Sequence, residues 1–141
     1  MINAKYVDDV NQGFRIGEVH CIDRKGRAVR FSKPGDVEKD CYRLLSVFSR
    51  EFQISADLFS LSCVLAKFYL GLIAIHPFRD GNRRTAFAFL EKRANDKGYS
   101  TGSLDLLRNI LFEGDVAAEM QKLIILFSRI ILKLEFSIQG V

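Results

Sequence analysis

Two residues in the stretch HPFRDGNRR (residues 76–84) could supply the acid–base and metal chemistry of a phosphate-transfer site. His76 carries an imidazole, the side chain that accepts a proton near neutral pH. Asp80 is a lone carboxylate, and Mg²⁺ is commonly held by one or two carboxylates together with substrate phosphates and water. The stretch therefore predicts a general base close in sequence to a candidate Mg²⁺ ligand.

Four further residues of this stretch are suited to binding phosphate. Gly81 and Asn82 tolerate a turn whose backbone N–H groups point inward, and they open a helix whose N-terminus attracts anions. Arg83 and Arg84 add positive charge, and a guanidinium can donate two hydrogen bonds to phosphate oxygens. Each residue alone has a simpler structural explanation, such as a histidine that ends a helix. Together they indicate transfer of a phosphate group to a hydroxyl.

Helices are expected on both sides of the stretch. Residues 58–75 form an almost uninterrupted apolar run, and a helix there must end at His76 because the residue before a proline is driven out of the helical region. The run is long enough for a membrane helix, but Lys67 and the serines within it favour a buried core helix. A second helix is predicted from near Asn82 to Gly98.

The N-terminal half predicts a β-hairpin and a further helix. Residues 14–31 contain two β-prone runs, EVHCI and AVRF, around a turn signal at residues 24–26. Asp36 can cap a helix in which apolar residues recur at helical spacing as far as Phe52. The hairpin therefore precedes the first long helix.

The remaining chain predicts a short helix capped by Ser103 and a long helix from Asp115. Hydrophobic residues make up 48% and charged residues 27% of the sequence, which is typical of a globular protein. The twelve phenylalanines favour an aromatic-rich core. We expect one all-α domain, residues 1–141, in which a helical bundle surrounds a buried central helix and carries an N-terminal β-hairpin flap.

The cysteine content and the net charge indicate which cellular compartment and which classes of partner to expect. Cys21, Cys41 and Cys63 are odd in number and widely spaced, which favours reduced thiols in the cytoplasm and gives no zinc-ligand pattern. The N-terminus lacks the apolar core of a signal peptide. A net charge of +4 permits a nucleic-acid partner without requiring one. We expect neither a nucleic-acid nor a membrane partner.

The stretch HPFRDGNRR resembles the signature of the Fic/Doc family, H-P-F-x-[D/E]-G-N-G-R-x-x-R. The residues that match are His76, Pro77, Phe78, Asp80, Gly81, Asn82 and Arg84. Residues 13–45 are similar to the flap hairpin of the family and the helix after it. Fic proteins usually transfer AMP from ATP to a Ser, Thr or Tyr hydroxyl of another protein, whereas Doc toxins share the helical fold and act as kinases.

The resemblance implies a role for each matching residue. His76 would deprotonate the target hydroxyl, and Asp80 would hold Mg²⁺ on the phosphates of ATP. Gly81 and Asn82 would form the anion hole, with Arg84 on the phosphates beyond it. Phe78 is expected to anchor the loop in the core and to take no part in the chemistry.

The resemblance also implies how a target protein is seated. The free edge of the hairpin would pair with an extended target segment through main-chain hydrogen bonds. The residues expected there are Val19, His20, Cys21, Ile22 and Val29. Alternatively, the hairpin only covers one edge of the core.

Two positions depart from the Fic pattern. Arg83 stands where Fic proteins have glycine, and Phe87 stands where they have a second arginine. Doc toxins carry lysine at the first position and also lack the second arginine. AMP transfer is the preferred interpretation, and transfer of the γ-phosphate is the alternative. A second alternative is a catalytically degenerate Fic-fold binding module, but retention of His76, Asp80 and the anion-binding residues argues against it.

Built-in inhibition of the usual Fic kind is not expected. That inhibition uses a helix of the form [S/T]-x-x-x-E-[G/N], and the only matching glutamate, Glu113 before Gly114, is preceded four positions earlier by Asn109. From the resemblance, an antitoxin or another inhibitory partner would then restrain the protein, as in a bacterial toxin–antitoxin pair. Delivery into a host cell as an effector is a further option.

Overall fold

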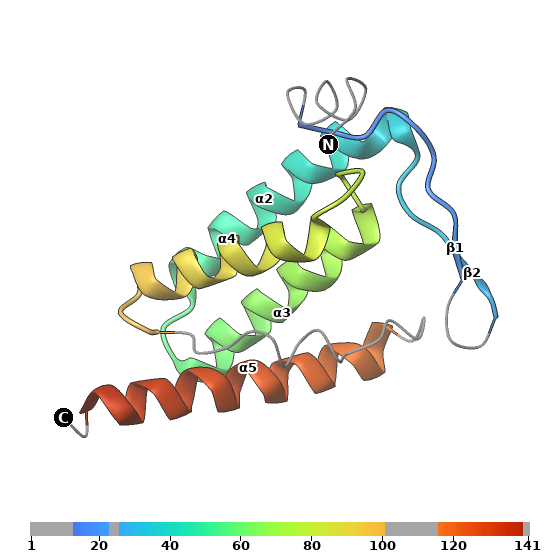
Figure 1. Cartoon of the computed structure of the whole chain (residues 1–141). Coiled ribbons are helices and arrows are strands. Elements are labelled where there is room, and N and C mark those ends of the chain that lie inside the picture. Colours follow the sequence, from blue (N-terminus) through green and yellow to red (C-terminus); the bar gives the residue numbers. More distant parts are fainter. Residues whose placement is uncertain (1–12, 23–25, 101–115, 140–141) are drawn as a thin grey trace, which may run out of the picture.

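A computed structural model describes residues 13–22, 26–100 and 116–139 (Figure 1). It confirms an all-α architecture with a small hairpin. The elements are strands β1 (Cys21–Ile22) and β2 (Ala28–Val29), the short 3-10 helix η1 (Pro34–Asp36), and helices α2 (Val37–Ile54), α3 (Leu58–Ile75), α4 (Asn82–Asp96) and α5 (Val116–Gln139). The short helix predicted after Ser103 lies outside the described residues, as do residues 24 and 25 of the predicted hairpin turn.

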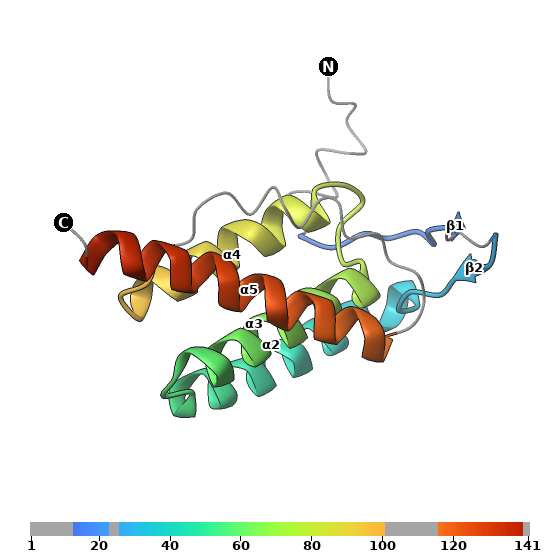
Figure 2. The ribbon, with the colours of Figure 1, turned by 90° about the horizontal axis from the view of Figure 1, so that it is seen from below.

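Helix α3 is the centre of the bundle, as its apolar sequence predicts. It packs against α2, α4 and α5, and Figures 1 and 2 show α5 running across it on the side away from the flap's base. Within the described residues it is the one helix long and apolar enough to span a bilayer. However, 56% of its residues are buried, including Leu61, Leu65 and Ala66, as in the core helix of a bundle.

Contacts between aromatic rings connect α2 with α3 and α4. The ring of Phe48 on α2 lies 5.2 Å from that of Phe52, 5.1 Å from that of Phe68 on α3 and 5.1 Å from that of Phe89 on α4, measured between centroids. Such ring pairs add to the hydrophobic contribution of their burial. The predicted aromatic-rich core is therefore present, and it holds α2 against α3 and α4, the two helices that flank the loop at residues 76–81.

Side-chain capping differs between the starts of α2 and α3. Asp57 caps α3 by accepting a hydrogen bond from the Ser60 backbone N–H at 2.7 Å, in a reciprocal capping box. Asp36 precedes α2 as predicted but forms no side-chain cap. The reason is η1, which already holds Asp36 in a helical conformation, so its carboxylate turns to Lys39 Nζ at 3.4 Å.

The flap hairpin is real but its strands are shorter than predicted. Cys21 pairs with Val29 and Ile22 with Ala28 in antiparallel register, whereas Val19 and His20 lie before β1. Nearer the base of the flap, the Arg15 guanidinium donates to the carbonyl oxygens of Gly17 (2.9 Å) and Ser32. A side chain thus joins the two arms of the flap just outside the predicted strands.

Candidate active site

His76 ends helix α3 in an unusual backbone conformation. Its N–H donates to the Leu72 carbonyl at 2.9 Å, and its φ of 54° and ψ of 60° lie in the left-handed region. Among the described residues, it is the one non-glycine residue with positive φ. Proline at position 77 explains why the helix stops, since it disfavours the right-handed helical region for His76. The left-handed turn costs roughly 1–2 kcal/mol for a residue with a Cβ, so neighbouring contacts must hold it.

Arg15 supplies those contacts from the base of the flap. Its Nε donates to the His76 carbonyl oxygen, its terminal nitrogen donates to the Ile75 carbonyl oxygen at 3.1 Å, and its backbone N–H donates to the Pro77 carbonyl oxygen at 2.7 Å. The residue is 4% exposed. One arginine thus holds three consecutive carbonyl groups at the end of α3, where helix geometry leaves carbonyls without partners.

The imidazole of His76 lies in an environment that disfavours its charged form. Its ring is tilted by 34° against that of Phe31, with the centroids 4.5 Å apart. Burial lowers the pKa of His76 from the ordinary 6.5, and the positive charge of Arg15 lowers it further. The side chain is therefore neutral near pH 7, which is the form that can accept a proton.

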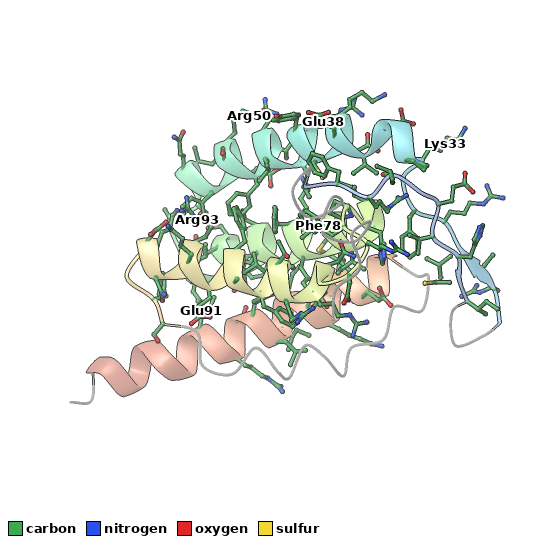
Figure 3. All side chains as sticks on the ribbon, turned by 45° about the horizontal axis from the view of Figure 1, so that its top comes forward. Lys33, Glu38, Arg50, Phe78, Glu91 and Arg93 are labelled. Atoms are coloured by element: carbon green, nitrogen blue, oxygen red, sulfur yellow. The ribbon has the colours of Figure 1, made fainter. Side chains whose placement is uncertain are left out.

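Asn82 locks the loop between α3 and α4. Its Oδ1 accepts the Phe78 N–H at 2.8 Å, and its Nδ2 donates to the Phe78 carbonyl oxygen at 2.9 Å. Phe78, labelled in Figure 3, stacks on Phe14 at 6.2 Å between centroids, so it anchors the loop as predicted. The Asn82 side chain is buried and already hydrogen-bonded within the loop, so the group that Asn82 can offer to an anion is its backbone N–H.

The start of α4 offers backbone N–H groups to an anion. Gly81 precedes the helix with a φ of 81°, a conformation that favours glycine, and its carbonyl accepts the first helical bond from Thr85 at 2.9 Å. Helix α4 has no side-chain cap. Its first N–H groups point out of the helix toward the loop, and the helix dipole adds a partial positive charge there.

Asp80 and Arg84 lie at the exposed rim of this helix start. Asp80 Oδ1 accepts the Gly81 N–H at 2.7 Å, and its Oδ2 lies 3.6 Å from Arg84 in an ion pair whose side chains are about 70% exposed. Such a pair contributes about 0–1 kcal/mol and is easily exchanged for another partner. The Arg84 guanidinium also lies over Gly81. Both side chains are thus available to a ligand at the helix start.

The donor set around Asp80 fits Mg²⁺ bound together with a nucleotide. Among residues 13–22, 26–100 and 116–139, no three His, Cys, Asp or Glu side chains gather as a metal cage. Mg²⁺ does not need one, because it keeps several waters and takes one or two carboxylates plus substrate phosphates. Asp80 would supply that carboxylate.

The two positions that depart from the Fic pattern face Tyr69 of α3. The ring of Phe87 stacks on Tyr69 with 5.6 Å between centroids and 6° between planes. Burial raises the pKa of Tyr69; the nearby charge of Arg83 opposes this shift and that of Glu119 adds to it. Arg83 is partly buried, and its charge is close enough to Tyr69 to act on the pKa of that side chain.

The predicted target-binding residues lie on an open part of the flap. Ile22 is 74% exposed, His20 and Cys21 are exposed, and Val19 and Val29 are partly covered. A hollow of about 260 Å³ lies between the arms of the flap and its base. It is lined by Arg15, Glu18, Val19, His20, Ala28, Val29, Arg30, Phe31, Ser32, Lys33 and Pro34.

Two residues that contact His76 were not predicted from the sequence. Arg15 stands in the segment GFRIG between two apolar residues, and this placement is the one signal that could have marked it as buried. Phe31 was expected only as the end of a strand. Its contact with His76 depends on the return path of the flap, which no local pattern specifies.

Comparison with known proteins adds a family. A model of the Fic/DOC family matches residues 2–92, which include the flap, α2, α3 and the loop at residues 76–81. No curated protein and no solved structure matches the chain. The match covers more than half of the sequence and ends within α4, so it contains every residue of the candidate site. The chain belongs to the Fic/DOC family.

Proposed function

We propose that the chain transfers AMP from ATP to a Ser, Thr or Tyr hydroxyl of a target protein, with His76 as the general base. Membership of the Fic/DOC family supports a transferase of the AMPylating or a related kind. The observation that carries the finer proposal is the state of His76: a partly buried imidazole beside Arg15, with a lowered pKa, joined by a short loop to the uncapped start of α4.

In the proposed step, His76 takes the proton of the target hydroxyl. The hydroxyl oxygen forms a bond to the α-phosphorus of ATP, and the bond between that phosphorus and the bridging oxygen toward the β-phosphate breaks. The products are the AMP ester of the target and pyrophosphate. A positioned base contributes on the order of 10²–10⁴ in rate, so His76 accounts for a substantial part of the acceleration.

The start of α4 is proposed to hold the phosphates. The backbone N–H groups of Asn82 and Arg83 face the anion, and Arg84 can leave its exposed pair with Asp80 to bind a phosphate oxygen. Mg²⁺, when bound with ATP at Asp80, would neutralise charge on the phosphates. The ion pair between Asp80 and Arg84 keeps both side chains near the site in the absence of nucleotide.

The flap is proposed to seat the target. The described strands are only two residues long, so an extended segment of the target adding to the edge at Ile22 would complete a larger sheet. Main-chain pairing of this kind accepts many sequences. The target hydroxyl would then be selected mainly by its position relative to His76.

Phe87 gives weight to transfer of the γ-phosphate as a second candidate. Because its ring is packed on Tyr69, position 87 offers no cation to the terminal phosphate of an ATP bound for AMP transfer. A nucleotide bound in the opposite direction would place the γ-phosphate at His76 and release ADP. We favour AMP transfer because Arg83 lies in the first turn of α4. Its backbone N–H can bind a phosphate there even though a side chain replaces the glycine of Fic proteins.

Control by a separate partner protein is also proposed. The segment with Glu113 and Gly114 lies outside the described residues, and its sequence does not match the inhibitory helix of Fic enzymes. An antitoxin or similar inhibitor acting in trans would then restrain the activity. Expression of the wild-type chain alone is expected to slow growth, and the His76→Asn variant is the matched control.

The proposal is tested with a cell lysate, Mg²⁺ and ATP labelled separately at the α- and γ-phosphates. Label retained on protein from α-labelled ATP supports AMP transfer. Label retained only from γ-labelled ATP supports the kinase. Retention of neither label, with the wild-type protein shown to be folded, supports a binding module and contradicts both enzymes.

A further inference from the structure

We propose that Arg15 is a positioning residue for the reaction, which holds His76 in its left-handed backbone conformation and its imidazole in place against Phe31. This inference rests on the proposed function of His76. Arg15 does not touch the reacting groups; it acts through the three carbonyl groups that it binds at residues 75–77.

The geometry of the contact supports positioning by several hydrogen bonds at once. The backbone N–H and the guanidinium of Arg15 approach the end of α3 together, so the loop is held on one side by Arg15 and on the other by Asn82. A guanidinium has five N–H donors in a fixed plane, which makes it suited to several carbonyl oxygens at fixed angles. Lysine has the same charge but cannot reproduce this arrangement.

The charges at the end of α3 also support a positioning role for Arg15. The C-terminal end of a helix carries a partial negative charge, which favours the cationic form of a histidine placed there. At the end of α3 the Arg15 guanidinium occupies the carbonyl oxygens of Ile75 and His76 and places a positive charge next to the imidazole. Burial of the ring is the larger cause of the lowered pKa of His76, and the charge of Arg15 adds to it, so that this helix end favours the neutral base.

Other charged groups lie around the loop, among them the exposed Arg79 of the loop itself. Phe31, which covers His76 from the returning arm of the flap, is neutral. Asp80 and Arg84 from the loop and α4 pair with each other. On the α2 side, Asp40 accepts a hydrogen bond from Ser32 at 2.7 Å, and Glu18 acts on Arg15. Among the residues that the structure describes, Arg15 is the charged residue that lowers the pKa of His76.

The test is an NMR titration of histidine-labelled full-length chain without nucleotide, combined with kcat and KM for ATP in the transfer reaction. The wild-type His76 signal should titrate below pH 6.5. In Arg15→Gln, loss of the charge should raise the pKa of His76 and move the acid limb of the kcat profile upward. In Arg15→Lys the charge remains, so the titration should stay near that of the wild type, while kcat falls by up to about 10²-fold from misplacement of the base. KM for ATP should change little in either variant.

Ser32→Ala is the matched control, because it removes the hydrogen bond to Asp40 and keeps the Ser32 carbonyl that Arg15 binds. It loosens the flap without touching the end of α3, so His76 should titrate as in the wild type and kcat should be retained. An equal loss of kcat in Ser32→Ala would overturn the proposal, since Arg15 would then act only by holding the flap. Wild-type kcat in Arg15→Lys would overturn it as well.

Failure of the fold and failure of the proposed function give different results. If Arg15→Gln does not fold, Arg15→Lys and Ser32→Ala still decide the matter. A wild-type His76 that titrates at or above pH 6.5 contradicts the proposal without any variant. If the wild type transfers no label, the proposed function fails, while the nucleotide-free titration still decides whether Arg15 acts on His76.

Discussion

Phe87 stacks on Tyr69 with the two rings nearly parallel, 5.6 Å between centroids and 6° apart. The contact joins α4 to α3 one turn beyond the start of α4 that is proposed to bind phosphate, at the position where Fic proteins carry their second arginine. At position 87 an aromatic ring packed on Tyr69 therefore stands where Fic proteins have a cationic side chain. The replacement is built into the packing, so it cannot be reversed by a surface substitution.

The first prediction is that Phe87→Arg destabilises the fold. The substitution removes the ring contact with Tyr69 and places a charge at a partly buried position, which is expected to lower the free energy of unfolding by about 1–3 kcal/mol. Urea denaturation measures the change. Phe87→Leu is the control and should lose less, because it keeps an apolar side chain there. Equal stability of Phe87→Arg and the wild type would show that the stack contributes little.

The second prediction separates the base from the backbone at position 76. Asparagine tolerates the left-handed conformation better than alanine does, so His76→Asn should fold and bind ATP normally while transfer falls by about 10²–10⁴. His76→Ala should lose transfer equally and be less stable by about 1 kcal/mol. His20→Ala, in the flap, controls for loss of a histidine. Full transfer by His76→Asn would exclude His76 as the base.

The third prediction concerns the loop lock made by Asn82. Asn82→Ala leaves the N–H and carbonyl of Phe78 without their partners, at a cost of about 1–3 kcal/mol for each group that stays buried. Asn82→Asp keeps the acceptor for the Phe78 N–H and loses only the donor. Amide hydrogen exchange at Phe78 should therefore be fastest in Asn82→Ala and intermediate in Asn82→Asp. Unchanged exchange in Asn82→Ala would contradict the lock.

The fourth prediction is a loss of stability on mild acidification. Because burial and Arg15 lower the pKa of His76 in the folded chain, the unfolded chain binds more protons below pH 6.5, and stability falls with pH there. The contribution is complete above pH 6.5 and is lost as the pH falls through the folded pKa of His76. Urea midpoints between about pH 5 and pH 7 should decline more steeply for the wild type than for His76→Asn. Parallel declines would contradict a lowered pKa.

The sequence was sufficient to predict the helices around the site. Proline at position 77 ends α3, glycine at position 81 opens α4, and the apolar run before His76 marks the central helix. These are local effects of single residues on the backbone, which is why they can be inferred without knowledge of the fold. The Fic/DOC family model matches residues 2–92, which contain this stretch and the flap segment before it.

The contacts that tune His76 could not be predicted in this way. Arg15 lies 61 residues before His76 in the chain, and its placement between two apolar residues indicates burial but not the partner that it binds. The flap strands are shorter than the β-prone runs predicted, and the two arms are joined beyond those runs by the guanidinium of Arg15, which binds Gly17 and Ser32. In the same way, the direction in which Phe87 packs depends on Tyr69 of another helix.

The most direct test of AMP transfer by His76 is the mass of a modified target. Wild-type chain and His76→Asn are each incubated with lysate, Mg²⁺ and ATP, and modified Ser, Thr or Tyr peptides are identified by mass spectrometry. The account predicts peptides that gain the mass of an AMP group with the wild type and none with His76→Asn. Peptides that instead gain a phosphate group, again only with His76 present, would contradict AMP transfer and assign the chain to the kinases.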